Sequence, residues 1–401
     1  MTNLQQLEDL LPDYQYVDDE RIVLTAGLLA TFYFWHGHKS SVRSALVECI
    51  EAYQTNYGAY LTWAFDAETA KPLPIEKMAP VRKLAAEMGP DDMLEWFAAS
   101  GDFDSATEYR ISAMTERGWQ ENQASMVSFV LPRDHAYIPE KREKMFGLIR
   151  MFAEKLSPFH GHVGLGAVSV HQQYRYQSDE IDVATRYRGL FIEDVFHGNW
   201  AYSGLTSIDW LTYVGETLAE RAGGIRELEN RLKKTGADVT NFPAGLLVAY
   251  GAEPDIGASH VDIPHLVSAV NAVLRPLRIG NVESMGFGST NSELRFNRYT
   301  SDLWTRRYDA PYIWPPASFI GLPERPLVKP RTPSLTLRTG DICGIGGRYQ
   351  YIATADPDQD EDYVPMVVLL PGDIAPYWVE SGPHGEYLGR TKVTWILIAE
   401  F

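Results

Sequence analysis

The stretch RIVLTAGLLATFYFWHGHKSSVRSALVECIEAYQTNYGAYLTWAF, residues 21–65, decides the fold of this chain. Its first part, residues 22–35, is dense in β-branched, aromatic and aliphatic side chains. An apolar run this continuous is typical of a strand that is buried on both faces, whereas a half-solvated strand alternates apolar and polar residues. We therefore predict a fully buried strand at 22–35.

A helix and a second strand follow it. Ser40 or Ser41 is a suitable N-cap for the helix, and Gly58 is a suitable residue to end it. Between them, apolar residues recur three or four positions apart, as on the core-facing side of a helix: Val42, Ala45, Leu46, Ile50 and Tyr53. Residues 61–65 start the next strand. The block is thus a strand, helix and strand unit.

Helix and strand patterns continue to alternate through the first three quarters of the chain. The clearest later helix lies at 140–156, where Pro139 occupies the first turn. Strands at 108–114 and 125–131 have no helix between them, so they require a hairpin. We predict an α+β (mixed α/β) fold over residues 1–311, with a mostly antiparallel sheet layered with helices.

The last quarter of the chain has a different composition. Proline is concentrated in a stretch that we interpret as an extended connector, residues 312–333. Short apolar runs separated by Gly- and Asp-rich turns then fill residues 334–401, and they show no helical spacing. This pattern predicts a small all-β module, which we expect to be SH3-like.

The overall composition is that of an ordinary globular protein. The chain has 401 residues, of which 45% are hydrophobic and 22% charged, so it can bury a large core. Its two cysteines, Cys49 and Cys343, exclude a disulfide framework and suggest a reducing compartment. Residues 1–15 do not resemble a signal peptide, and 22–35 is too short to span a bilayer. We expect a cytoplasmic protein.

The charge balance limits the kinds of partner. Lys and Arg together number 36 against 53 Asp and Glu, which gives a formal net charge of −17. Nucleic acids and anionic membranes are bound by basic patches, so neither is an expected ligand. An acidic protein is compatible with a basic protein partner, whose approach the field would accelerate.

Two His-X-His triplets suggest a metal, one at His36 and His38 and the other at His160 and His162. The glycine between each pair favours a turn, and neither pair has a visible third ligand. We therefore expect structural histidines and no metal. The stretch DPDQDED, residues 356–362, begins like a calcium loop but lacks the required Gly and the final Glu.

No local catalytic signature accompanies these histidines. The chain contains neither G-x-S-x-G, nor a phosphate-binding G-x-x-x-x-G-K-S/T, nor H-E-x-x-H. We expect no enzymatic activity and no cofactor. A metal-dependent hydrolase built on the His-X-His pairs remains the alternative, as does a non-catalytic adaptor that binds partners through the β module.

Carboxylates combine with aromatic side chains in two places, and such mixtures are typical of protein interfaces. We predict that both clusters bind a protein partner. The first cluster consists of Tyr14, Tyr16, Asp18, Asp19 and Glu20. The second consists of Asp179, Glu180, Asp182, Tyr187, Glu193 and Asp194.

Several segments of the sequence resemble a bacterial family known as domain of unknown function 3396, a type VI secretion immunity family. They are KSSVRSALVECIEAY, GAYLTWAFD, DDMLEWFAAS, EYRISAM, SMVSFVLPRDH, FHGHVGLGAVSV, SIDWLTYVG and GLLVAYGAEPDIG. The resemblance covers residues 4–312 and is strongest to TsiT-type members. It implies an immunity protein that neutralises a cognate secreted toxin, a nuclease with a basic surface, by stoichiometric protein–protein inhibition. A homodimer is an open alternative for its assembly.

Overall fold

A computed structural model provides the three-dimensional description of the chain. It describes residues 3–67, 69–171, 176–193, 201–259, 261–280, 282, 285–286, 295–309, 314–315, 336–351, 366–369, 373–381 and 387–400. The chain divides into two compact units. The first comprises Met1–Val282 and Thr305–Tyr312, and the second comprises Glu283–Trp304 and Ile313–Phe401.

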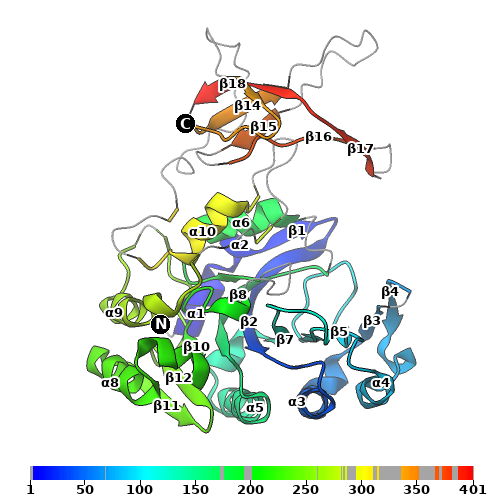
Figure 1. Ribbon diagram of the computed structural model, residues 1–401, viewed down its shortest axis with the longest axis vertical. Coiled ribbons are helices and arrows are strands. Elements are labelled where there is room, and N and C mark those ends of the chain that lie inside the picture. The colour runs from blue at the N-terminus through cyan, green and yellow to red at the C-terminus, as the bar shows by residue number, and fades with distance from the viewer. Residues whose placement is uncertain are drawn as a thin grey trace. The chain divides into compact units, whose positions relative to one another are not determined.

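The first unit is built on a twelve-stranded sheet (Figure 1). Its main path runs in the order β11-β12-β10-β8-β2-β7-β6-β5-β3-β4, with β1 beside β2 and β9 beside β8. Among the described residues of this sheet, every strand pairing is antiparallel except that of β8 with β9. The strands are β1 (Tyr16–Asp18), β2 (Arg21–Phe34), β3 (Trp63–Asp66), β4 (Lys71–Pro74), β5 (Glu95–Ala99), β6 (Arg110–Met114), β7 (Ser125–Leu131), β8 (His160–Ser169), β9 (Phe191–Ile192), β10 (Leu211–Gly215), β11 (Asp238–Phe242) and β12 (Gly245–Ala249). The predicted antiparallel α+β architecture is confirmed.

Strand β2 lies near the middle of this sheet, and the predicted burial on both faces is confirmed from Val23 to Phe34, where only Thr25 is half-buried. The prediction fails at Ile22, which is 39% exposed. Leu28, Ala30, Phe32 and Phe34 belong to the main core, which also contains residues of the helices. The alternate residue Tyr33 joins a separate cluster with Met126 on the other face. Since successive side chains of a strand point to opposite faces, both faces of β2 are covered.

Helices cover the main core side of the sheet. Figure 1 shows α3, α5 and α8 in a row along it. In the described part of the chain, the α-helices are α1 (Asn3–Asp9), α2 (Leu11–Tyr14), α3 (Ser40–Tyr57), α4 (Val81–Glu87), α5 (Pro139–Leu156), α6 (Gln177–Arg186), α7 (Glu216–Ala219), α8 (Ile225–Thr235), α9 (His265–Leu274) and α10 (Arg298–Thr305). The predicted helices beginning near residues 40 and 140 are confirmed. Within the described ranges, no helix is both long and apolar enough to cross a membrane.

The structure differs from the sequence-based expectations in several local details. The N-cap of α3 is Lys39 rather than Ser40 or Ser41, and no side chain caps that end. Residues 75–88 do not form one continuous helix, because the 3-10 turn Ile75–Lys77 and α4 lie on either side of Pro80. Strands β10 and β11 were not predicted, although β10 lies between β8 and β12 within the sheet.

The two ends of the sheet path carry different edge strands. Strand β4 pairs with β3 through Pro72 and Pro74, which lie opposite Phe65 and Trp63. At the other end, β11 pairs with β12, and its sequence DVTNF is mostly polar. Proline lacks a backbone N–H and is therefore tolerated mainly at sheet edges.

The second unit contains a four-stranded sheet in the order β13-β18-β14-β15 and a separate hairpin of β16 and β17. These strands are β13 (Thr336–Arg338), β14 (Gly347–Tyr351), β15 (Met366–Leu369), β16 (Trp378–Ser381), β17 (Tyr387–Thr391) and β18 (Thr394–Glu400). Tyr349 and Trp395 are buried in its own apolar core. The small C-terminal all-β module is thus confirmed. Of the predicted connector, only residues 314–315 are described, so the connector and the SH3-like fold stay predictions.

Candidate protein-binding surface

The first predicted cluster lies on a tight hairpin formed by β1 and β2. Val17 pairs with Ile22 and Asp18 pairs with Arg21, which leaves Asp19 and Glu20 at the turn. Both turn residues have positive φ, 47° and 66°. Two positive φ values in succession are typical of a type I′ turn, whose twist matches that of the two strands it joins in a two-residue hairpin. The turn therefore projects two carboxylates, and the Asp19 side chain is 86% exposed.

An apolar pair lies next to these carboxylates. Val17 is 59% exposed and Ile22 is 39% exposed. They are directly opposite each other in the hairpin register, so their side chains share one face. Exposed apolar side chains that adjoin each other and are bordered by charges are typical of protein interaction sites.

Helix α6 brings the second predicted cluster to the same hairpin (Figure 1). The Tyr16 hydroxyl donates to the Asp182 carboxylate, and Arg186 donates to both, at 2.7 Å to Tyr16 Oη and 2.8 Å to Asp182 Oδ2. Burial, followed by the Asp182 carboxylate, raises the pKa of Tyr16, so its hydroxyl keeps the proton that it donates. Tyr176, just before α6, donates to Asp18 at 2.7 Å.

The exposed members of the two clusters, more than 150 positions apart in sequence, therefore form one continuous surface. We call it the hairpin–α6 surface. It consists of Tyr16, Val17, Asp18, Asp19, Glu20, Ile22, Asp179, Asp182 and Arg186.

Arg21 holds the Asp19 carboxylate at the hairpin tip only weakly. Arg21 lies 3.9 Å from Asp19 and 3.4 Å from Asp104, and all three side chains are well exposed. Solvent-exposed ion pairs of this kind contribute only about 0–1 kcal/mol. A basic partner can therefore replace them at small cost.

The other predicted site residues lie inside the protein. Tyr14 is 1% exposed, donates to the Leu7 carbonyl at 2.9 Å and packs edge-on against Tyr187 at 5.9 Å. Tyr187 is 6% exposed. The two tyrosines pack the end of α2 against the end of α6 inside the first unit. Their role is therefore packing and not contact with a partner. Asp194 lies outside the described residues.

The two remaining predicted carboxylates are buried in polar contacts. Glu180 is 6% exposed and accepts a hydrogen bond from the Ser169 hydroxyl at 2.7 Å. Burial raises the pKa of Glu180 to about 8, against a usual value of 4.5. Glu193 accepts from Arg110 at 2.7 and 2.5 Å and from Ser128 at 3.1 Å. Neither carboxylate is available to a partner in this structure.

A second exposed feature was not predicted from the sequence. Trp119 is 65% exposed, and the guanidinium of Arg117 lies 5.9 Å from the centre of its ring. Arg117 also lines an open groove, whose other lining residues include Met78, Met88 and Asp92. Because Trp119 lies in an irregular loop, no apolar periodicity marks it in the sequence.

The histidine pairs have different environments. His160 and His162 are 1% and 3% exposed within β8, and burial lowers the pKa of both, that of His160 to about 4. The turn expected at Gly161 is wrong: this glycine lies in the strand, where a Cβ would come within 2.6 Å of the Phe32 ring. His36 and His38 do lie in a turn, as expected. Residues 356–362 lie outside the described residues.

Comparisons with known proteins agree with this architecture. The family model TsiV, described as type VI immunity for VRR-NUC, matches residues 45–308. Among solved structures, the chain is similar to a structure titled "Pseudomonas aeruginosa T6SS protein PA0821", with a TM-score of 0.67 and 23% sequence identity. That similarity covers 74% of this chain and 87% of the other, and it shows a shared fold. No curated protein matches the sequence.

Proposed function

The chain belongs to the TsiV family of type VI immunity proteins for VRR-NUC, and from this premise we propose that it binds its cognate toxin stoichiometrically through the hairpin–α6 surface. Membership confirms the immunity family predicted from the sequence, and it makes the chain a non-enzymatic inhibitor of a nuclease toxin. The finer resemblance to TsiT-type members stays a prediction.

The observation that carries the proposal is that exposed residues of both predicted clusters meet on one surface. Tyr16 and Asp182 come from different clusters and share a hydrogen bond, and the exposed Val17–Ile22 pair lies on the same hairpin. Apolar side chains at the centre and charges around them are the usual arrangement of a specific interface. For lasting neutralisation we expect about 1,600 Å² of total buried area, so neighbouring residues would also contribute.

The chemistry of the partner favours an acidic inhibitor. A nuclease must hold an anionic nucleic-acid backbone, and proteins do this with Lys and Arg. A formal net charge of −17 therefore attracts such a toxin and accelerates the encounter. The proposal places this encounter in the cytoplasm, where the toxin's substrate lies.

The first prediction concerns stoichiometry. Purified VRR-NUC-type toxin, titrated with this protein, should lose its nuclease activity in proportion to added inhibitor and reach full inhibition near one equivalent. A binder without turnover removes one toxin molecule per inhibitor molecule. The measurement is residual nuclease activity at toxin concentrations well above the dissociation constant. Complete inhibition far below one equivalent would contradict stoichiometric binding.

The second prediction concerns the hairpin tip. Asp19→Lys/Glu20→Lys should weaken toxin binding about 10- to 100-fold, or about 1.4–2.8 kcal/mol, because reversal replaces attraction by repulsion. Much of the loss of affinity should come from a slower association rate. The difference in association rate between the parent and the variant should become smaller at high salt. Binding kinetics at two ionic strengths measure both effects. The tip residues are exposed, so thermal stability should be unchanged.

A matched control reverses two exposed carboxylates far from the hairpin. Glu220→Lys/Asp238→Lys changes the net charge by the same amount as the hairpin variant. Glu220 lies shortly before α8 and Asp238 begins β11. Figure 1 shows α8 and β11 away from β1 and α6. If the control and the hairpin variant weaken binding equally, the effect is one of total charge. In that case the surface around Trp119 becomes the next candidate.

A further inference from the structure

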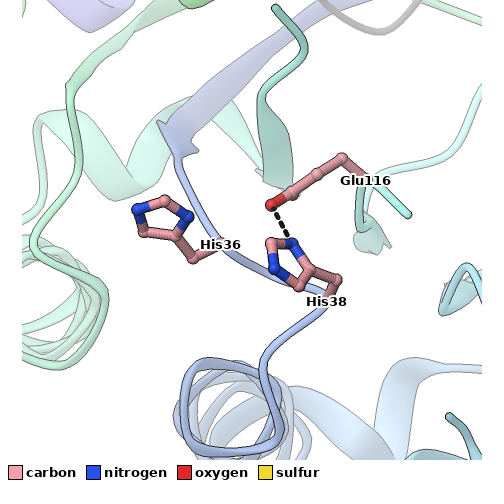
Figure 2. A group of neighbouring side chains, drawn as sticks. All are labelled: His36, His38 and Glu116. Carbon is pink, nitrogen blue, oxygen red and sulfur yellow. Dashed lines mark hydrogen bonds and ion pairs between the residues drawn. The ribbon is translucent and has the colours of Figure 1, made fainter. Parts of the chain in front are cut away.

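The turn that joins β2 to α3 gathers three side chains that can bind a metal (Figure 2). His36 and His38 come from the turn itself, and Glu116 comes from the loop after β6. In Figure 2 the Glu116 carboxylate points into the space between the two imidazole rings. One ligand atom from each residue lies within 4.8 Å of the other two, and His38 Nδ1 is 3.0 Å from Glu116 Oε1.

The spacing suits a zinc-sized ion. Zinc binds imidazole nitrogen at about 2.0–2.1 Å and carboxylate oxygen at about 2.0–2.2 Å in tetrahedral geometry. Two such ligands lie about 3.3 Å apart, close to the distance between His38 and Glu116. His36 is exposed, so its ring is free to turn towards the other two ligands.

The surrounding residues fix the Glu116 side chain and the backbone of His38. Ser125 donates its hydroxyl to Glu116 Oε2 and accepts the Glu116 backbone N–H at 3.0 Å. Arg43 donates to the His38 carbonyl at 2.9 Å and to the carbonyls of Met88 and Gly89. Hydrogen bonds of this kind, which orient the ligands of a metal, are a regular part of metal sites.

The backbone of the turn is adapted to the same arrangement. A Cβ on Gly37 would come within 2.2 Å of the Ser125 hydroxyl, so only glycine allows the turn to approach the Glu116 loop. His36 has a φ of 68°, which is uncommon for a residue other than glycine. Such backbone conformations cluster at functional sites.

We propose that His36, His38 and Glu116 bind one divalent transition-metal ion of the zinc class, with water completing its coordination. Sequence spacing predicted no metal at these histidines because no third ligand was visible, and Glu116 supplies one from 78 positions beyond His38. The ion would tie the start of α3 to the loop between β6 and β7. This proposal is independent of toxin binding.

The third prediction tests this site with zinc chloride and cobalt chloride on the metal-stripped full-length protein. Equilibrium dialysis should give one zinc per chain, and cobalt should give the visible absorption of a tetrahedral N/O site. His38→Ala and Glu116→Gln should lower the affinity at least about 10- to 100-fold. Zinc should also raise the melting temperature of the parent protein and not that of these variants.

Two further variants make the result decisive. His36→Ala changes an exposed side chain, so it tests the site even if a variant at the buried Glu116 fails to fold. His265→Ala removes an exposed histidine at the start of α9 and should leave zinc binding unchanged. The absence of saturable binding would overturn the proposal, as would equal binding by the parent, His36→Ala and His38→Ala proteins.

Discussion

Replacing Glu193 by alanine should lower the free energy of unfolding by about 3–5 kcal/mol, the usual cost of leaving a buried charge without its partner. The Arg110 side chain is 4% exposed and that of Glu193 is 14% exposed. The Arg110 Nε has no hydrogen-bond partner among the described residues, so the guanidinium depends on the two contacts to Glu193. Chemical unfolding of the parent and variant measures the change.

A surface ion pair provides the control for this variant. Glu51 pairs with Arg82, and their side chains are 38% and 59% exposed. Glu51→Ala should therefore cost about 0–1 kcal/mol. The double variant Arg110→Met/Glu193→Leu should recover most of the loss, since buried ion pairs can be replaced by apolar residues. Equal stability of Glu193→Ala and Glu51→Ala would show that Arg110 finds another partner.

The second large effect is a loss of stability as the pH rises, and it comes from Glu180. Burial raises the pKa of this carboxyl from 4.5 to about 8 in the folded chain. Between these values the unfolded chain releases the proton while the folded chain keeps it. The unfolded state then binds fewer protons, so the free energy of unfolding falls with pH. The full difference corresponds to about 5 kcal/mol and is reached above pH 8.

Glu180→Gln isolates this contribution. The glutamine oxygen can accept the same hydrogen bond from Ser169, and the amide carries no charge to bury. We expect the variant to be about as stable as the parent near pH 5 and more stable near pH 8. Burial also raises the pKa of Asp209, to about 7. Because Asp209 is present in both proteins, it makes the free energy of unfolding of both fall with pH in a similar way at lower pH. Parallel stability curves for the two proteins would contradict the assignment.

The sequence predicted the elements whose signal is local. The strand at 125–131 was found in full because every residue of β7 is buried, and α5 was found because its apolar residues follow the helical period. The five residues of β10 were missed because so short an apolar run carries little periodicity. Pro80 is itself a sequence signal for the start of α4 at Val81, because proline disfavours the helical conformation of the residue before it.

The candidate site depended on contacts that no local pattern records. The pairing of Tyr16 with Asp182 joins residues 166 positions apart, and only the fold brings them together. The burial of Glu180 did have a signal, because it shares a helical stripe with Ile181 and Ala184. The prediction of Glu180 as a surface carboxylate was therefore wrong, because the stripe faces the protein interior. The contribution of the hairpin–α6 surface to toxin binding stays a prediction.

The two prolines of β4 have a consequence for how the protein behaves at high concentration. An exposed sheet edge offers free N–H groups to which another chain can add, and this is a common route to aggregation. Pro72 and Pro74 lack those groups, so β4 is a poor template for a further strand. Edge-to-edge growth is therefore discouraged on this side of the sheet. An inhibitor that is consumed one molecule per toxin must accumulate without polymerising, and this edge helps to keep it dispersed.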